Sequence, residues 1–206
     1  MTKKERITGL MAALRQEYPL AECTLAETDP WRLLVQVRLA AQCTDARVNM
    51  VTPALFQAAP NPRAMVELGW QEVRRYIATC GLTETKARRI VETSRLLLER
   101  HGGAVPSSFE ELEALPGVGH KTASVVMNQA FGHPAFPVDT HIFRLARRWG
   151  LSRGSTVERV EADLKKAFPM DTWGRVHIQF VLWGRTYCPA RGCNPACPIC
   201  AQLGAR

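Results

Sequence analysis

The residues Leu115-Pro116-Gly117-Val118-Gly119-His120-Lys121-Thr122-Ala123 lie between two segments whose apolar residues recur at helical spacing. We expect Gly117 and Gly119 to give the backbone the freedom that a turn into a helix requires. A helix that begins at such a turn presents unpaired N–H groups and the positive end of its dipole, which favour phosphate. Lys121 would lie in the first turn of this helix, where a lysine either binds the phosphate or acts as a nucleophile. The turn alone leaves both roles open.

Two predicted helices flank this turn, over residues 108–115 and 121–131. Together they form a helix–hairpin–helix pattern, whose backbone N–H groups can hold a DNA phosphate without reading the base sequence. The alternative is an αα-corner in which the glycines only permit close packing. The Leu-Pro pair before the glycines and the Lys-Thr-Ala run after them favour the DNA-binding pattern.

Helical spacing continues through most of the chain, and no useful length alternates with a period of two. The sequence therefore predicts an all-α protein of about nine to eleven helices. Asp29 and Ser108 stand before two of these helices as capping residues, and Gly69 separates two short ones. The predicted helices cover residues 7–18, 30–41, 46–56, 63–68, 71–79, 85–100, 108–115, 121–131, 142–149, 157–167 and 173–187. The remainder, after residue 187, is rich in cysteine and shows no periodicity.

The charge balance of the 206 residues is basic, with 27 Lys and Arg against 19 Asp and Glu, a net charge of +8. Residues 133–206 hold 11 basic and 5 acidic residues, so +6 of this excess lies there. Such a distribution suits a polyanion such as nucleic acid, and a basic face without such a partner is the alternative. No signal peptide or membrane-spanning run is visible, so we expect a cytoplasmic protein with no membrane partner.

Four of the seven cysteines lie within 13 residues near the end of the chain: Cys188, Cys193, Cys197 and Cys200. In a cytoplasmic protein a cluster of this kind indicates a metal site rather than disulfides. Four thiolates separated by Pro and Gly suit a 4Fe–4S cluster. Zinc is the alternative, because Cys197-x-x-Cys200 is also a zinc knuckle, but zinc ribbons usually carry two knuckles well apart in sequence.

Residues 115–123, followed by Pro137-Val138-Asp139-Thr140-His141, resemble the helix–hairpin–helix and Gly/Pro-rich aspartate signature of base-excision DNA glycosylases. Ala41-Gln42-Cys43-Thr44-Asp45 and the four terminal cysteines narrow the resemblance to the bacterial endonuclease III family. It extends from about residue 5 to residue 200. The cysteine spacing differs, since the gaps are four, three and two residues here and six, two and five residues in that family.

This resemblance implies a fold of two helical domains. A six-helix domain of residues 23–133 would carry the hairpin, and residues 1–22 and 134–206 would form a discontinuous domain with the iron–sulfur cluster. The implied activity is that of a bifunctional DNA glycosylase and abasic-site lyase. Its substrate would be double-stranded DNA containing oxidised pyrimidines or abasic sites, and the enzyme would be a monomer located in the cytoplasm at the nucleoid.

The resemblance also assigns the chemistry. The neutral amine of Lys121 would attack the sugar C1′, the base would leave, and a Schiff base would form before β-elimination breaks the strand. Asp139 would stabilise the positive charge that develops on the sugar and position the nucleophile. On sequence alone Asp139 is an ordinary helix N-cap, and the two roles are compatible. Lys121 argues against a monofunctional mismatch glycosylase, in which the matching residue is not lysine.

The remaining expected DNA contacts are Gln42, Leu82, Gly117, Gly119, His120 and His141. By resemblance, Gln42 fills the gap left by a flipped nucleotide and Leu82 wedges the opposite strand. A polar helix end and a core contact are the structural alternatives for these two residues. A non-catalytic helix–hairpin–helix module and an electron carrier are further alternatives, although an electron carrier would need neither the glycine turn nor Lys121.

Overall fold

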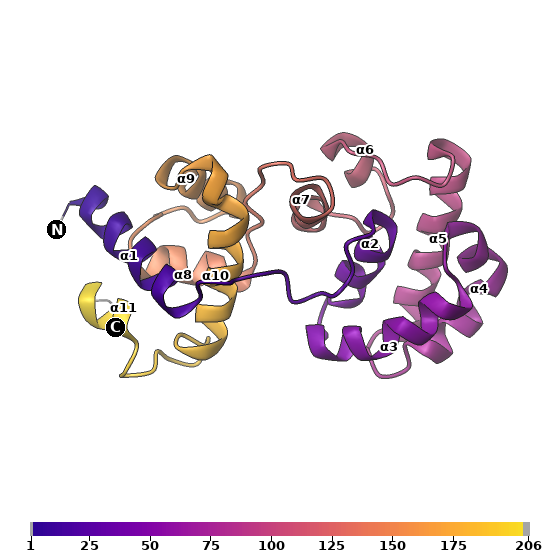
Figure 1. Ribbon diagram of the computed structural model, residues 1–206, viewed down its shortest axis with the longest axis horizontal. Coiled ribbons are helices and arrows are strands. Elements are labelled where there is room, and N and C mark those ends of the chain that lie inside the picture. The colour runs from indigo at the N-terminus through magenta and orange to yellow at the C-terminus, as the bar shows by residue number, and fades with distance from the viewer. Residues whose placement is uncertain (1, 204–206) are drawn as a thin grey trace. The chain divides into compact units, whose positions relative to one another are not determined.

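The computed structural model describes residues 2–203, and over this range it contains α-helices and one 3-10 helix but no strand (Figure 1). The prediction of an all-α protein is confirmed. The chain divides into two compact units, one formed by Cys23–His133 and the other by the segments before and after it. No helix in the described range is both long enough and apolar enough to cross a bilayer.

The unit Cys23–His133 contains six helices, of which α2 packs against α3, α5 and α7. Asp29 caps α2 by accepting a hydrogen bond from the N–H of Arg32 at 2.9 Å, and Pro30 occupies its first turn. The apolar side chains of α2 form the centre of the core, with Leu33 and Leu39 fully buried. The helices are α2 (Pro30–Leu39), α3 (Asp45–Ala58), α4 (Pro62–Tyr76), α5 (Thr83–His101), α6 (Phe109–Glu113) and α7 (His120–Gln129).

Gly69 breaks α4 as the sequence predicts, because its φ of 77° is a left-handed conformation inside a helix. The two predicted short helices therefore follow one another as the kinked halves of α4.

The second unit is built on α10, whose aromatic side chains fill its core. Phe180 packs edge-on against Trp149 at a centroid distance of 4.9 Å, and Trp183 is also buried there. Gln179 donates from Nε2 to the carbonyl oxygens of Leu14 and Tyr18, which fastens the end of α1 to α10. The elements are α1 (Lys3–Glu17), α8 (Thr140–Arg148), α9 (Val157–Ala167), the 3-10 helix η1 (Met170–Thr172), α10 (Trp173–Thr186) and α11 (Pro198–Leu203).

Two short elements, η1 and α11, are absent from the sequence prediction. Each is too short for apolar periodicity to be recognised. In α11, Ile199 and Cys200 are buried against the unit's core, so tertiary packing stabilises this helix.

Candidate nucleic-acid interface and metal centre

The hairpin between α6 and α7 begins at Ser108, whose Oγ accepts from the N–H of Glu111 at 3.3 Å and caps α6. Gly117 has a φ of 71°, a left-handed conformation that favours glycine. Gly119 is different, because its φ of −94° is open to any residue, and the expectation that both glycines supply backbone freedom is wrong there. Apart from Gly119 and its two chain neighbours, no described residue has an atom within 4 Å of where a Cβ on Gly119 would stand, and Gly119 gives α7 no side-chain cap. The start of α7 is therefore open to a ligand such as phosphate.

Arg38, at the end of α2, lies beneath the hairpin and is only 8% exposed. Its Nη1 donates to Thr93 Oγ1 at 2.8 Å and to the carbonyl oxygen of Pro116. A Cβ on Gly117 would lie 3.0 Å from Arg38 Nη2 and 3.1 Å from Arg89 Nη1, so the turn packs closely against two guanidinium groups. Burial, together with the charge of Arg89, lowers the pKa of Arg38 to about 10. Arg38 was not predicted from the sequence, although an arginine in so apolar a helix was a visible signal.

His120 and Lys121 are the first two residues of α7, and both are exposed. The His120 ring stacks on Phe109 with centroids 5.4 Å apart, and its Nδ1 lies 2.7 Å from Glu113 Oε1. These contacts join the two helices of the hairpin. Burial raises the pKa of the Cys23 thiol, and the charge of Lys121 acts to lower it.

Gln42 and Leu82 are the two non-glycine residues with positive φ in the described chain, at 55° and 47°. Gln42 lies in the turn between α2 and α3, and Leu82 precedes α5. Both side chains are exposed, and Leu82 is 60% accessible. A bulky residue in the left-handed region is strained, and such strain clusters at functional sites. The two residues expected to enter the duplex are thus also the two in which the backbone is strained.

Asp139 and His141 lie at the start of α8, in the other unit. Asp139 Oδ1 accepts from the N–H of Ile142 at 2.8 Å, so Asp139 is the N-cap that the sequence predicts. Arg144 Nη2 lies 3.1 Å from His141 Nδ1, which must accept this bond because a guanidinium only donates. Burial lowers the pKa of His141, although the Asp139 carboxylate acts to raise it.

The four predicted cysteine ligands converge, with their Sγ atoms all within 4.8 Å of one another. Cys188, Cys197 and Cys200 are buried, and Cys193 is half-buried. The structure thus assembles a four-cysteine metal-binding site from the non-periodic end of the chain. Its donor set fits either an iron–sulfur cluster or zinc.

A tryptophan N–H and two arginines lie beside this cysteine site. Trp183 Nε1 donates to Cys197 Sγ at 3.3 Å, and Arg144 donates to the Cys188 carbonyl oxygen at 2.8 Å. A hydrogen bond to the Cys188 thiol raises the pKa of Arg148. Burial raises the pKa of Cys188 to about 11, and binding of a metal ion would release this proton. Neither arginine was identified from the sequence.

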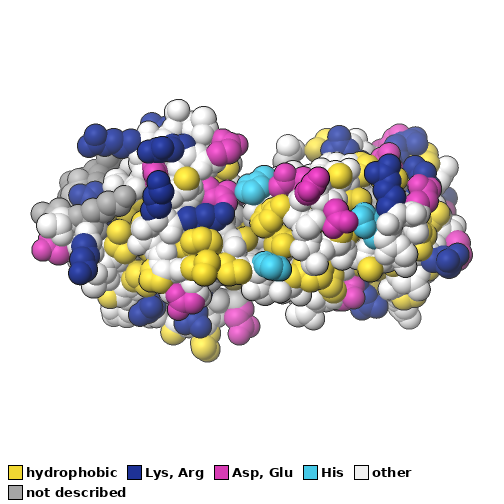
Figure 2. Space-filling view, turned by 90° about the horizontal axis from the view of Figure 1, so that it is seen from above, with side chains coloured by type: hydrophobic (Ala, Val, Ile, Leu, Met, Phe, Trp, Pro, Cys, Tyr) yellow, Lys and Arg dark blue, Asp and Glu magenta, His cyan; other side chains and the backbone are white. Residues whose placement is uncertain are grey.

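The charged surface is mixed on the face drawn in Figure 2, where Lys and Arg side chains on both units are interspersed with acidic and hydrophobic ones.

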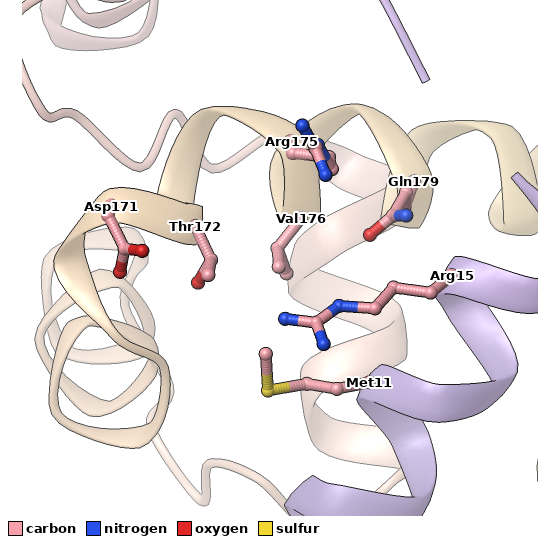
Figure 3. Close-up of a pocket in the computed structure, with 7 residues that line it drawn as sticks. All are labelled: Met11, Arg15, Asp171, Thr172, Arg175, Val176 and Gln179. Carbon is pink, nitrogen blue, oxygen red and sulfur yellow. The ribbon is translucent and has the colours of Figure 1, made fainter. Parts of the chain in front are cut away.

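One pocket of about 160 Å³ lies between α1 and the start of α10. Figure 3 shows Arg15 extending from α1 into this pocket, between Met11 and Val176. Its lining contains none of the predicted site residues and consists of Met11, Arg15, Asp171, Thr172, Arg175, Val176 and Gln179.

Comparison with known proteins agrees with this geometry. Residues 35–170 match the family described as HhH-GPD superfamily base excision DNA repair protein. The chain is 44% identical over 200 residues to endonuclease III of Escherichia coli (strain K12), with 97% of this chain and 93% of that protein covered. Endonuclease III of Haemophilus influenzae is also 44% identical, with the same shares covered.

A solved structure of a trapped endonuclease III–DNA covalent intermediate matches with a TM-score of 0.91 and 38% identity, covering 98% of this chain and 95% of that one. The resemblance seen in the sequence motifs is therefore confirmed at the level of both sequence and fold. The chain belongs to the endonuclease III family, within the HhH-GPD superfamily of base excision DNA repair proteins.

Proposed function

We propose that the protein is a bifunctional DNA glycosylase and abasic-site lyase of base excision repair, which removes oxidised pyrimidines from duplex DNA. The observation that carries this proposal is Lys121, an exposed lysine in the first turn of α7, directly after the open glycine turn of a family hairpin. The related structure trapped as a covalent DNA intermediate supports a mechanism that passes through an enzyme–DNA bond.

In this mechanism the hairpin holds a DNA phosphate at the start of α7 and brings the damaged nucleotide to Lys121. The neutral amine attacks C1′ of the sugar, the C1′–N bond breaks, and the electron pair leaves with the base. The C1′–O4′ bond then breaks as a proton is transferred to O4′, which opens the sugar ring and gives a Schiff base between Lys121 and C1′. This Schiff base makes the neighbouring C2′ proton acidic, and loss of that proton breaks the C3′–O bond and expels the 3′ phosphate by β-elimination. The Asp139 carboxylate stabilises the positive charge on the sugar and takes the proton that the attacking amine loses.

Extrusion of the nucleotide leaves a gap in the base stack, which Gln42 and Leu82 would fill from the two strained turns. His120 and His141 would add polar contacts near the phosphate and the extruded base. Because one chain carries both Lys121 and Asp139, we infer that the enzyme acts as a monomer. Its substrate, chromosomal DNA, would place it in the cytoplasm at the nucleoid.

The four cysteines would hold a 4Fe–4S cluster in this proposal. The support comes from the all-cysteine donor set, from the arginine and tryptophan donors beside it and from the family resemblance. When bound, the cluster would fasten the segment that contains α11 to the end of α10. The compact spacing of the sulfurs also suits a single zinc ion. Visible absorption of the purified protein distinguishes them, because iron–sulfur proteins are coloured and zinc proteins are not.

Borohydride trapping tests the proposal directly. Reduction of the Schiff base should link wild-type protein covalently to duplex DNA containing an abasic site, and Lys121→Gln should abolish the link. Lys166→Gln, an exposed lysine on α9, is the matched control and should trap like wild type. Trapping that persists in Lys121→Gln would show that another amine is the nucleophile.

A panel of duplex oligonucleotides should then be assayed separately for base release and strand cleavage. Thymine glycol and other oxidised pyrimidines are expected to be released, and an undamaged duplex is not. Release of mismatched adenine without strand cleavage would instead support a monofunctional mismatch enzyme.

A further inference from the structure

Lys86 connects the two turns that carry Gln42 and Leu82. Its Nζ donates to the carbonyl oxygen of Leu39, the last residue of α2, at 2.9 Å and to that of Cys80 at 2.7 Å. Its backbone N–H donates to the carbonyl oxygen of Leu82 at 3.0 Å. The backbone bond is the first one of α5, whereas the side chain holds the carbonyl two residues before Leu82 and also the end of the helix that leads into Gln42.

The two turns also touch one another. A Cβ on Gly81 would lie 4.0 Å from the carbonyl oxygen of Gln42, so the backbones of the two turns are neighbours. Burial and a hydrogen bond with the Cys43 thiol raise the pKa of Cys80 to about 11, which places these two thiols in contact as well. The strained conformations of Gln42 and Leu82 can persist only if their surroundings hold them, and these contacts provide that support.

The position of Lys86 is an unfavourable one for a cation. The side chain is only 8% exposed, and Lys86 stands near the start of α5, where the helix dipole opposes positive charge. Within residues 2–203 no carboxylate lies within ion-pair distance of its Nζ, and burial lowers the pKa of Lys86. Its two carbonyl partners are the interactions that offset this cost.

We propose that Lys86 is a positioning residue for duplex insertion, which fixes the two turns relative to each other so that Gln42 and Leu82 enter the base stack together. The inference rests on the proposed function, in which these side chains replace a flipped nucleotide. Lys86 touches no substrate and acts through the two turns. Its loss therefore impairs the steps that need an intact duplex and leaves the amine chemistry of Lys121 unchanged.

The experiment compares two substrates for each variant. One is a duplex containing thymine glycol, for which single-turnover excision is measured. The other is a single-stranded abasic-site oligonucleotide, for which the rate of borohydride trapping is measured. Because this substrate has no opposite strand, it does not require insertion of Gln42 and Leu82 into a duplex. The variants are Lys86→Met, Lys86→Arg, Leu82→Ala and the double variant Leu82→Ala/Lys86→Met.

Ser94→Ala is the matched control for a general loosening between α2 and α5. Ser94 Oγ is fully buried and accepts from Trp31 Nε1 at 3.2 Å, so this bond also joins α2 to α5 but touches neither turn. If circular dichroism shows that Lys86→Met is unfolded, Lys86→Gln takes its place under the same criteria. The glutamine side chain is one bond shorter and keeps an N–H donor.

We expect Lys86→Met to slow duplex excision on the order of 10²-fold, a loss typical of misplaced groups remote from the chemistry. Trapping on the single strand should match wild type, and Lys86→Arg should restore most of the duplex rate. The double variant should be no slower than the slower of its two parents, because both changes disable one insertion step.

Three results would overturn the inference: equal slowing on both substrates, duplex excision no slower than in Ser94→Ala, or effects that multiply in the double variant. These results differ from a failure of the proposed function. In that case wild type itself neither excises thymine glycol nor becomes trapped, and both proposals are rejected.

Discussion

Substitution of Asp139 separates a structural role from a chemical one. Its Oδ1 accepts a 2.8 Å hydrogen bond from the N–H of Ile142, and an asparagine in its place keeps an oxygen there. Because Asn and Asp are nearly equal as N-caps, Asp139→Asn should change the free energy of unfolding by less than about 0.5 kcal/mol. Asp139→Ala removes the acceptor and should cost about 1 kcal/mol. For a chain of this length that loss corresponds to about 2–4 °C in Tm.

Activity should respond differently, because asparagine carries no charge and accepts no proton. Both variants should lose about 10²- to 10⁴-fold in the rate of base release, the usual contribution of a general acid–base group. Asp29 provides the matched control, since it caps α2 through the same bond, from Arg32 N–H at 2.9 Å. Asp29→Ala should lower stability by a similar amount and leave the excision rate unchanged.

Two measurements on the same preparations separate the structural role from the chemical one: urea unfolding, and single-turnover excision of thymine glycol. If Asp139→Asn excises at the wild-type rate, Asp139 is only a helix cap and the assignment of a catalytic carboxylate is wrong. If Asp29→Ala loses activity as severely as Asp139→Ala, the loss reflects helix stability rather than chemistry.

Three further predictions concern the supports of the site. Arg38→Met leaves the Pro116 carbonyl without its donor, so the free energy of unfolding measured in urea should fall by about 1–3 kcal/mol. Binding of abasic-site duplex, measured by fluorescence anisotropy, should also weaken. Unchanged binding would contradict a role for Arg38 in holding the hairpin. Burial lowers the pKa of His141 in the folded protein below the unfolded value near 6.5. The stability that neutral His141 contributes is therefore complete above about pH 6.5 and is lost as the pH falls through the folded pKa. Urea unfolding at pH 7.5 and pH 5 should therefore show a smaller acid loss in His141→Gln than in wild type, and equal losses would refute this. Removal of the metal by a chelator should expose residues 188–203 to limited proteolysis while Cys23–His133 stays resistant, and equal cleavage of both would contradict a local role for the cysteine site.

Much of the helical framework could be predicted from the sequence because its signals are local. Asp29 and Ser108 cap the helices that follow them, and Gly69 breaks α4. Each effect acts within one helical turn, so a short window of sequence contains it. The helix α11 escaped prediction because it has only six residues and depends on the burial of Ile199 and Cys200.

The supports of the site could not be predicted in the same way. Arg38 reaches Pro116 across 78 residues of sequence, and Lys86 reaches Leu39 across 47. Such bonds depend on how helices pack, which no local pattern records. Gly119 is a related case, because the sequence motif indicates a glycine but does not reveal whether φ or ligand access requires it.

The positive φ angles of Gln42 and Leu82 have a consequence for protein engineering. Glycine adopts this conformation without strain, so replacing either residue by glycine should be neutral or stabilising by up to about 1 kcal/mol. A thermostability screen would therefore tolerate or favour glycine at both positions and remove the side chains proposed to fill the gap in the duplex. Variants of this enzyme chosen by melting temperature alone would be stable but would excise damaged bases poorly. Engineering for stability should therefore also select for excision activity on damaged duplex DNA.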